Sequence, residues 1–309
     1  MHFAQVVARL RLIGISRPRT SYSHQAAIEC FDPNTHVFEP KTTIEDIFVA
    51  VEDRTVTYGV VPFENSTNGS VVFTLDLFCD RSSQYRSTRV CGEAYLDVHH
   101  CLLSPAKDLK SITKIYSHPQ AFGQCETWLN ANLKGVERVD VSSTSKAAQI
   151  AAGFEDAGAI ASKIASDVKG LKILAENIED SHDNTTRFFV LSATKRSGVS
   201  TGEWTVEEGG GKKKDKSLLS FTIDHKLPGA LCDSLRVFKD FDLNLTSIVS
   251  RPTRVVKWNY IFFVEFEGHA ETDNAKQALE ELKRYCVDLR VLGSYVDKQG
   301  RKGSRYKES

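Results

Sequence analysis

Residues 184–191 read Asn-Thr-Thr-Arg-Phe-Phe-Val-Leu, a polar entrance followed by an apolar run of the kind that forms a buried strand. Thr186 and Arg187 place a hydroxyl and a guanidinium side by side at that entrance. A guanidinium binds a carboxylate through two parallel hydrogen bonds, and a hydroxyl donates a hydrogen bond to a nearby oxygen. The stretch therefore predicts either an anion-binding site at the start of a strand or a Thr-rich turn that leads into a core strand.

The composition is that of an ordinary globular protein. Of the 309 residues, 41% are hydrophobic and 26% are charged, and the length suggests two or three domains. The 40 basic and 40 acidic residues balance, which argues against a general nucleic-acid-binding protein. Seven scattered cysteines without a Cys-x-x-Cys pair favour reduced thiols in the cytoplasm. No apolar run reaches about 18 residues, so no membrane span is expected.

The N-terminal stretch has two interpretations. Four arginines precede the first acidic residue, Glu29, as in a transit peptide. Alternatively, residues 11–16 form the first strand of the fold, which leaves no room for a cleaved leader. We favour the second interpretation and expect a cytoplasmic protein.

A stretch poor in large apolar residues divides the chain. Residues 197–216 contain a triple glycine and a triple lysine and are predicted to form a flexible linker. The linker separates a body, residues 1–196, from a tail domain, residues 217–296. The polar residues 297–309 are expected to be disordered.

Strand-like and helix-like stretches alternate in the body, which predicts an α/β fold with a mostly parallel sheet. The predicted strands are 58–63, 112–116 and 159–161, and two predicted helices are 119–133 and 145–152. The tail domain has its own order, β-α-β-β-α-β, which is the ferredoxin-like arrangement. Its predicted elements are 218–223, 229–242, 245–250, 259–266, 274–285 and 289–295.

Three predicted helices of the body begin at residues that suit anion binding: Ser21, Ser117 with Pro119 in the first turn, and Ser143 with Thr144. Ser and Thr are also the preferred N-cap residues of any helix, so each start alone is explained without a ligand. Three such starts in one α/β body, together with Thr186 and Arg187, favour a polyanion site at the ends of strands.

Other polar groups have both a functional and a plain interpretation. Gln120 and Gln124 are spaced i, i+4 and share a helix face, which suits either a substrate hydroxyl or solvent. The loop 64–70, Glu-Asn-Ser-Thr-Asn-Gly-Ser, is either a turn or a part of the site. The pair His99-His100 would point to opposite faces of a strand, so no metal site is expected. The sequence has no phosphate loop or nucleophile elbow, and no cofactor is expected.

Several stretches of the body, taken in order, resemble the prephenate dehydratase family. They are Ser23-His24-Gln25-Ala26-Ala27, Val61-Pro62-Phe63-Glu64-Asn65-Ser66, Gly69-Ser70-Val71, Thr74-Leu75-Asp76-Leu77, Ser117-His118-Pro119-Gln120-Ala121 and Thr186-Arg187-Phe188. The tail resembles an ACT regulatory domain of the phenylalanine-binding type, on Pro228-Gly229-Ala230-Leu231 and on residues 244–252, Asn-Leu-Thr-Ser-Ile-Val-Ser-Arg-Pro. Together the resemblance covers about 21–295.

The resemblance implies a two-lobed body like that of a periplasmic binding protein, with the site in the cleft. One lobe would comprise about 1–80 and 177–196, and the other about 95–175. It also implies a homo-oligomer, a dimer or tetramer, that is joined through ACT domains and binds phenylalanine as an effector. Neither a nucleic-acid nor a membrane partner is expected.

The implied activity is the decarboxylating dehydration of prephenate to phenylpyruvate in L-phenylalanine biosynthesis, without a cofactor. The resemblance assigns catalysis to Thr186, Arg187, Asn65 and Gln124, with Thr186 as the donor to the leaving hydroxyl. It assigns substrate binding to Glu64, Ser66, Ser117, His118, Ser143, Thr144 and Phe188, and phenylalanine binding to Gly229, Ala230, Leu231, Asn244, Ser250, Arg251 and Pro252. His118 is a rival general acid, because imidazole titrates near neutral pH.

Two departures from the family pattern leave alternatives open. Residues 17–21, Arg-Pro-Arg-Thr-Ser, stand in place of a Gly-Pro-x-Gly-Thr loop, which removes two glycines. Val249 stands in place of a glutamate before Ser-Arg-Pro, so the carboxylate that the family pattern has at this position of the effector domain is missing. The alternatives are an arogenate dehydratase, with Glu64 as a candidate partner of the substrate amine, a non-catalytic amino-acid sensor, and a solute-binding protein.

Overall fold

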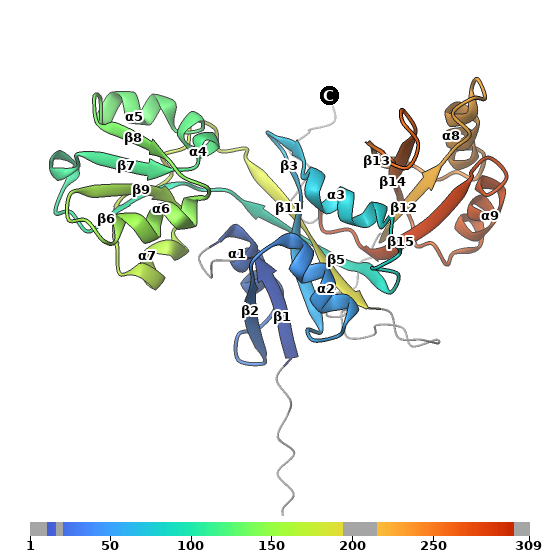
Figure 1. Cartoon of the computed structure of the whole chain (residues 1–309), viewed down its shortest axis with the longest axis horizontal. Coiled ribbons are helices and arrows are strands. Elements are labelled where there is room, and N and C mark those ends of the chain that lie inside the picture. The colour runs from blue at the N-terminus through green and yellow to red at the C-terminus, as the bar shows by residue number, and fades with distance from the viewer. Residues whose placement is uncertain (1–10, 17–20, 194–214, 300–309) are drawn as a thin grey trace, which may run out of the picture. The chain divides into compact units, whose positions relative to one another are not determined.

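The computed structural model describes residues 11–16, 21–193 and 215–299, and the chain divides into two compact units. The first unit comprises Met1–Thr43, Glu64–Gly69 and Leu96–Arg187, and the second comprises Ile44–Phe63, Ser70–Tyr95 and Phe188–Ser309. The elements labelled in Figure 1 are, in chain order, β1 (Arg11–Ser16), α1 (Tyr22–Cys30), β2 (His36–Lys41), α2 (Ile44–Glu52), β3 (Tyr58–Asn65), β4 (Gly69–Ser70), α3 (Val72–Cys79), β5 (Thr88–Asp97), β6 (Cys101–Ser104), η1 (Leu109–Ser111), β7 (Lys114–Ser117), α4 (Pro119–Gly123), α5 (Glu126–Asn132), β8 (Glu137–Asp140), α6 (Thr144–Ala151), β9 (Ala157–Ala161), α7 (Ile164–Lys169), β10 (Lys172–Ala175), β11 (Thr185–Ala193), β12 (Asp215–Thr222), α8 (Ala230–Asp240), β13 (Leu245–Pro252), β14 (Tyr260–Glu267), α9 (Asp273–Leu282) and β15 (Asp288–Val296).

The first unit contains a five-stranded sheet with the strand order β10-β6-β9-β7-β8. Alternate residues of β9 face opposite sides, as a strand requires. Ala159 packs with the alanines of α6, whereas Ile160 packs with Phe122 and Leu129 of α4 and α5. Figure 1 shows these helices on opposite sides of the sheet, which gives three layers. In the same unit β1 pairs in parallel with β2, so the predicted strand at 11–16 is confirmed.

The prediction of a mostly parallel sheet is wrong for this sheet, which is mixed. β7 runs parallel to β8 and β9, but β6 is antiparallel to both β9 and β10. The chain passes from β7 to β8 through α4 and α5, and from β8 to β9 through α6, as strands that run in the same direction need. β6 instead follows β5 after only residues 98–100, without a crossover helix.

The single helix predicted over 119–133 is two helices, α4 and α5. Gln124 is the C-cap of α4, and Cys125 lies outside the helical region at φ −123° and ψ 18°. The carbonyl of Gln124 accepts a hydrogen bond from the Asp180 N–H at 2.7 Å, so a distant segment satisfies it. Apolar residues on both sides of the break enter one core, which explains why the apolar pattern predicted one helix.

In the second unit, strands β3, β11 and β5 are neighbours in that order. Phe63 of β3 stacks on Phe189 of β11, with ring centroids 4.0 Å apart. Tyr295 of β15 contacts the same Phe189 ring at a centroid distance of 5.5 Å. Aromatic packing therefore joins β15 to β11, the strand that begins with residues 185–187.

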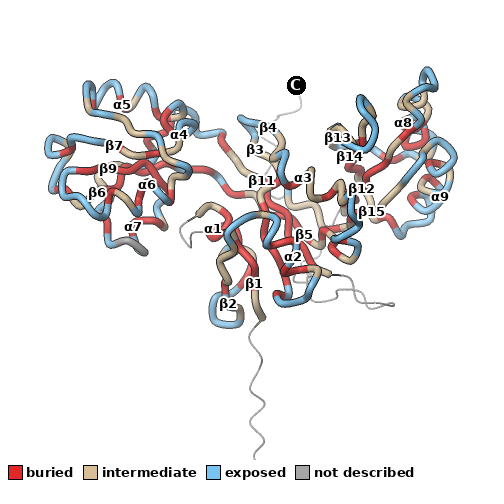
Figure 2. The backbone as a smooth tube through the Cα atoms, viewed as in Figure 1, coloured by how far each residue is buried: buried red, intermediate tan, exposed pale blue. Residues whose placement is uncertain are grey.

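The predicted β-α-β-β-α-β order of the tail is confirmed. Its four strands form an antiparallel sheet in the order β13-β14-β12-β15. Helices α8 and α9 contribute Phe238 and Leu282 to a core that also contains Phe221 and Phe266 from the sheet, so both helices cover one face. Figure 2 shows the buried segments of these strands in red. Among the described helices, none is long and apolar enough to cross a membrane.

The strand β12 begins at Asp215, inside the predicted linker, whose residues 197–214 lie outside the described part of the chain. Lys216 was assigned to the flexible linker, but its side chain is only 2% exposed. The ammonium lies 3.0 Å from Asp297, 3.5 Å from Glu93 and 3.8 Å from Glu265. Three carboxylates around one ammonium explain how a lysine enters a buried strand.

The predicted disorder of 297–309 is wrong for the first residues of that stretch. Asp297 pairs with Lys216, and the N–H of Lys298 donates to Glu93 at 2.7 Å. Residues 300–309 lie outside the described chain. Nearby, Gly293 approaches β5 so closely that a Cβ there would lie 2.0 Å from the carbonyl oxygen of Val90, so only glycine fits.

Candidate functional site

The Asn65 side chain connects the end of β3 to the start of β11. Its Nδ2 donates to Asn184 Oδ1 at 2.6 Å and to Thr186 Oγ1 at 3.0 Å. Its Oδ1 accepts from the backbone N–H groups of Thr67 and Asn68 at 3.1 and 3.0 Å. Because backbone donors occupy the oxygen end, the amide orientation is fixed and the NH2 end must face Thr186.

This orientation determines what the Thr186 hydroxyl can do. Its oxygen accepts the hydrogen bond from Asn65, so the hydroxyl hydrogen is not used in that contact. Thr186 is half-buried at the start of β11, beside the buried Arg187. A hydroxyl that accepts from an amide becomes a better donor to a third group, because successive hydrogen bonds polarise one another.

Backbone and hydroxyl hydrogen bonds hold the loop 64–69 against the start of β11. The Ser66 N–H donates to the Thr185 carbonyl at 2.9 Å. The Ser66 hydroxyl donates to the Asp183 carbonyl and accepts from the Thr185 N–H, both at 2.9 Å. The Thr185 hydroxyl donates to Asp97 at 2.8 Å. Ser66 therefore fixes the loop, and its predicted contact with a substrate stays a prediction.

A second polar group surrounds Gln124. Gln124 Oε1 lies 2.8 Å from Nε2 of His100, which is 2% exposed, and Nδ1 of His100 lies 2.9 Å from the hydroxyl of Tyr22. The His100 N–H donates to Glu179 at 2.9 Å, and Glu179 also bonds to the exposed His99 at 2.8 Å. Burial raises the pKa of Glu179, but the hydrogen bonds from His99 and from the His100 backbone outweigh it and lower the pKa below its usual value.

His99 is exposed and His100 is buried, but both lie between β5 and β6 and not on the predicted strand. Among the residues that the structure describes, no group of three or more His, Cys, Asp or Glu side chains is arranged to hold a metal. The sequence did not single out Tyr22, His100, Glu179 or Asn184 as site residues. For Glu179, the only indication in the sequence was that it lies a few residues before the stretch Asn184–Phe188.

The predicted anion-binding helix starts are occupied by local hydrogen bonds. The Ser117 hydroxyl is buried and donates to the Ile160 carbonyl at 3.0 Å. His118 caps α4, with Nδ1 accepting from the Gln120 N–H, and Ser143 caps α6 by accepting from the Lys146 N–H. Thr144 is the first residue of α6, Glu64 lies half-buried at the end of β3, and Phe188 is a core residue at 1% exposure. Their roles toward a substrate stay predictions.

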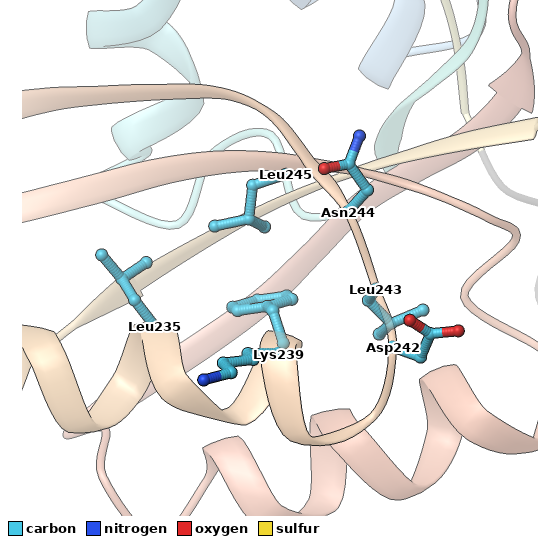
Figure 3. A pocket seen from close by; sticks show the side chains of 7 residues that line it. Leu235, Lys239, Asp242, Leu243, Asn244 and Leu245 are labelled. Atoms are coloured by element: carbon cyan, nitrogen blue, oxygen red, sulfur yellow. The ribbon is translucent and has the colours of Figure 1, made fainter.

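A pocket of about 350 Å³ lies in the tail domain between the C-terminal half of α8 and the start of β13. Figure 3 shows it lined by Leu235, Phe238, Lys239, Asp242, Leu243, Asn244 and Leu245. Of the predicted effector residues, Asn244 lines it. Gly229 is at the other end of α8, where its φ of +83° at the N-cap suits glycine.

Of the remaining predicted effector residues, Ala230 and Leu231 begin α8. Ser250, Arg251 and Pro252 are on β13, where Arg251 is bound to another residue. Arg251 forms two parallel hydrogen bonds with Asp76 of α3, Nε to Oδ1 at 2.9 Å and Nη2 to Oδ2 at 3.2 Å. Arg254 also reaches Asp76 at 3.1 Å. Burial raises the pKa of Asp76, but the hydrogen bond and the charge of Arg251, with help from Arg254, outweigh it and lower the pKa below its usual value.

Comparison with known proteins identifies both parts of the chain. The family model for prephenate dehydratase matches residues 13–196, and that for the ACT domain matches residues 219–284. A bifunctional chorismate mutase/prephenate dehydratase of Aquifex aeolicus is 41% identical over 278 residues, 90% of this chain and 71% of the relative. Arogenate dehydratase 2 of Petunia hybrida is 34% identical over 95% of this chain and 73% of its own.

A solved structure agrees with these matches. The prephenate dehydratase of Arthrobacter aurescens in complex with L-Phe superposes with a TM-score of 0.80 at 27% identity, covering 93% of this chain and 90% of that one. The fold that the family resemblance implied is confirmed by this likeness. The boundaries given for the two lobes stay a prediction.

Proposed function

Because the chain belongs to the prephenate dehydratase family, we propose that it converts prephenate to phenylpyruvate, with loss of CO2 and water. The observation that carries the proposal is the fixed Asn65 amide, which leaves the Thr186 hydroxyl as a hydrogen-bond donor. The reaction needs such a donor, because the ring hydroxyl must leave as water rather than as hydroxide.

The proposed reaction breaks two bonds and consumes one proton. The bond from the ring to its carboxylate breaks, and its electron pair enters the ring as the hydroxyl leaves from the opposite ring carbon. The leaving oxygen takes up a proton to give water, and the ring becomes aromatic. A threonine hydroxyl is a very weak acid, so Thr186 acts as a preoriented hydrogen-bond donor to the leaving oxygen, which takes up a hydronium-derived proton from the bulk solvent.

Arg187 follows this donor in the chain and supplies positive charge. Its side chain is buried, so the charge acts in a medium of low dielectric constant and is strong at short range. Prephenate carries two carboxylates, and the ring carboxylate must lose its negative charge as CO2 departs. We propose that Arg187 acts on the site electrostatically and that Gln124 donates to a substrate oxygen.

The direct test is to incubate the purified protein with prephenate and, separately, with arogenate, and to follow phenylpyruvate and phenylalanine. Turnover of prephenate at a kcat/KM at least tenfold above that for arogenate supports the proposal. The reverse preference would assign the activity of the Petunia relative to this chain. A folded protein that binds phenylalanine and turns over neither substrate would be an amino-acid sensor.

The orientation of Asn65 gives a sharper prediction. Asn65→Asp keeps the shape and the oxygen end but places a second oxygen against Thr186 Oγ1. The Thr186 hydroxyl then donates to that carboxylate instead of to the leaving group, so we expect kcat to fall about 30- to 100-fold, with KM changed less than threefold. Steady-state kinetics with prephenate measure both. Thr67→Ala, which keeps the backbone N–H that Asn65 accepts from, is the control and should retain nearly full activity.

We propose that phenylalanine binds the ACT domain of this chain and that two copies are needed to enclose it. Helix α8 has 11 residues and is therefore about 16 Å long, so Gly229 and Asn244 lie at opposite ends of it. One chain cannot close both ends around one small amino acid. A second copy that contributes the opposite end of its α8 would complete the enclosure, which supports the predicted homo-oligomer. Size-exclusion chromatography with light scattering measures the oligomeric state.

The ion pair of Arg251 and Asp76 is a route by which effector binding in the ACT domain would affect the candidate active site. Asp76 is on α3, whose start is fixed to β3 by two hydrogen bonds, Val71 N–H to Phe63 O at 2.7 Å and Thr74 Oγ1 to Pro62 O at 2.6 Å. β3 ends at Asn65. A shift of β13 on effector binding would therefore be transmitted to the residue that orients Thr186.

Weakening this pair is expected to change regulation more than catalysis. In Asp76→Asn the charge that binds Arg251 is lost, so we expect the phenylalanine concentration for half-maximal effect to change at least threefold, with kcat in its absence changed less than twofold. Activity measured against phenylalanine concentration checks this. Glu271→Gln, which removes an exposed ion pair of the tail domain, should leave the response unchanged. An unaltered response in Asp76→Asn would exclude this route.

A further inference from the structure

Tyr22 and His100, which form a line of hydrogen bonds to Gln124, have no role in the function proposed above. Tyr22 is the first residue of α1, and His100 immediately precedes β6, so the two come from distant parts of the chain. Tyr22 Oη lies 2.9 Å from His100 Nδ1, and His100 Nε2 lies 2.8 Å from Gln124 Oε1. The three side chains thus form one continuous line of hydrogen bonds.

The imidazole in the middle of this line is neutral. His100 is 2% exposed, and burial lowers its pKa below the usual value. Glu179 contacts the His100 backbone N–H, while its side-chain partners are His99 and His182 at 2.8 and 3.3 Å. A neutral imidazole has one N–H and one acceptor nitrogen, so the two ends of the His100 ring play opposite roles.

The neighbours of His100 determine which nitrogen carries the hydrogen. The Gln124 atom that faces Nε2 is an oxygen, which only accepts, so Nε2 must be the donor. Nδ1 is then the acceptor, and the Tyr22 hydroxyl supplies the hydrogen. Tyr22 Oη also lies 3.2 Å from the His99 carbonyl, and donation to it would reverse the whole line and turn the Gln124 oxygen away from His100.

We infer that Tyr22 and His100 are positioning residues for the reaction, holding the Gln124 amide so that its NH2 group, and not its oxygen, is presented to the substrate. The inference rests on the proposed function, in which Gln124 donates to a substrate oxygen. The carboxylates of prephenate only accept hydrogen bonds, so an amide oxygen that faced one of them would repel it. The direction of hydrogen bonding in Tyr22 and His100 therefore determines whether Gln124 helps or hinders binding.

The first test measures the tautomer of His100 without any substrate. Nitrogen-15 NMR of histidine-labelled protein distinguishes a ring nitrogen that carries hydrogen from one that does not, and His100→Gln identifies the signals. The inference requires that the hydrogen is on Nε2 in the wild-type protein. In Tyr22→Phe, which lacks the donor to Nδ1, the equilibrium between the two His100 tautomers should shift toward hydrogen on Nδ1. Hydrogen on Nδ1 in the wild-type protein overturns it. This result is independent of the substrate, so it stands or falls separately from the proposed function.

The second test is a double-mutant cycle in kcat/KM for prephenate. His100→Phe keeps a planar ring but removes both hydrogen bonds, and we expect about a tenfold loss, the usual size for one oriented hydrogen bond. In a Gln124→Met background the same change should cost less than twofold, because His100 then has nothing to orient. Equal losses in the two backgrounds would mean that His100 only supports the fold, which overturns the inference. His100→Gln, which retains an N–H donor, should recover part of the loss.

Discussion

Replacing Thr186 with alanine is expected to lower kcat for prephenate by about 100- to 1,000-fold, the usual cost of removing one preoriented donor to a developing charge. The donor is available because Thr186 Oγ1 accepts from Asn65 at 3.0 Å, which leaves its hydrogen for the leaving oxygen. Thr186→Ser keeps the hydroxyl and should retain at least a tenth of the activity. KM should change little in either variant, because the interaction is strongest in the transition state.

His118 provides the contrasting case. Its Nδ1 caps α4 by accepting from the Gln120 N–H, a role that asparagine also fills, so His118→Asn preserves the helix start. If Thr186 is the donor, His118→Asn should retain activity within about tenfold. A large loss in His118→Asn together with a small loss in Thr186→Ala would transfer the acid role to His118.

Replacing Lys216 with methionine is expected to lower the free energy of unfolding by about 3–5 kcal/mol, because the variant leaves buried carboxylates without their cation. The ammonium lies within 4 Å of Glu93, Glu265 and Asp297, and the first two side chains are at most 2% exposed. Hydroxyl groups also donate to Glu265, from Thr246 at 2.6 Å and Tyr295 at 2.5 Å, but they do not replace a charge. Urea denaturation at pH 7, followed by circular dichroism, measures the change.

A matched control distinguishes the loss of a buried ion pair from the loss of an exposed one. Lys276→Met removes another ion pair of the tail domain, 3.1 Å from Glu271, but that lysine side chain is 54% exposed. Its loss should cost less than about 1 kcal/mol. Adding Glu93→Gln to Lys216→Met should recover part of the stability, because it removes one of the uncompensated charges. Equal effects of Lys216→Met and Lys276→Met would show that the carboxylates around Lys216 are screened by water.

Much of the fold could be predicted because it follows from local periodicity. The tail order of strands and helices and the first strand at 11–16 are confirmed because apolar spacing and turn residues determine them. The break between α4 and α5 could not be predicted, because it depends on a hydrogen bond from Asp180, more than fifty residues further along the chain. Lys216 was assigned to the linker for the same reason, since the carboxylates that bind it come from β5, from β14 and from the residue after β15.

The candidate site shows the same limit. Asn65 and Thr186 belong to separate stretches of the sequence. Only the fold shows that the Asn65 amide orients the Thr186 hydroxyl. The histidine pair was considered as a metal site and set aside, because alternation along a strand separates His99 from His100. Nothing in the local sequence pairs His100 with Tyr22 and Gln124, since those contacts span 78 and 24 residues.

The contact between Asn65 and Thr186 also constrains when the site can form during folding. The two residues are 121 positions apart, so closing that loop costs about 4 kcal/mol of chain entropy. One hydrogen bond returns only about 1 kcal/mol, so the contact cannot hold the loop closed alone. Strand pairing and core packing along the intervening chain must come first. The hydroxyl therefore acquires its orientation late, and a partly folded chain with most of its secondary structure still has no competent site.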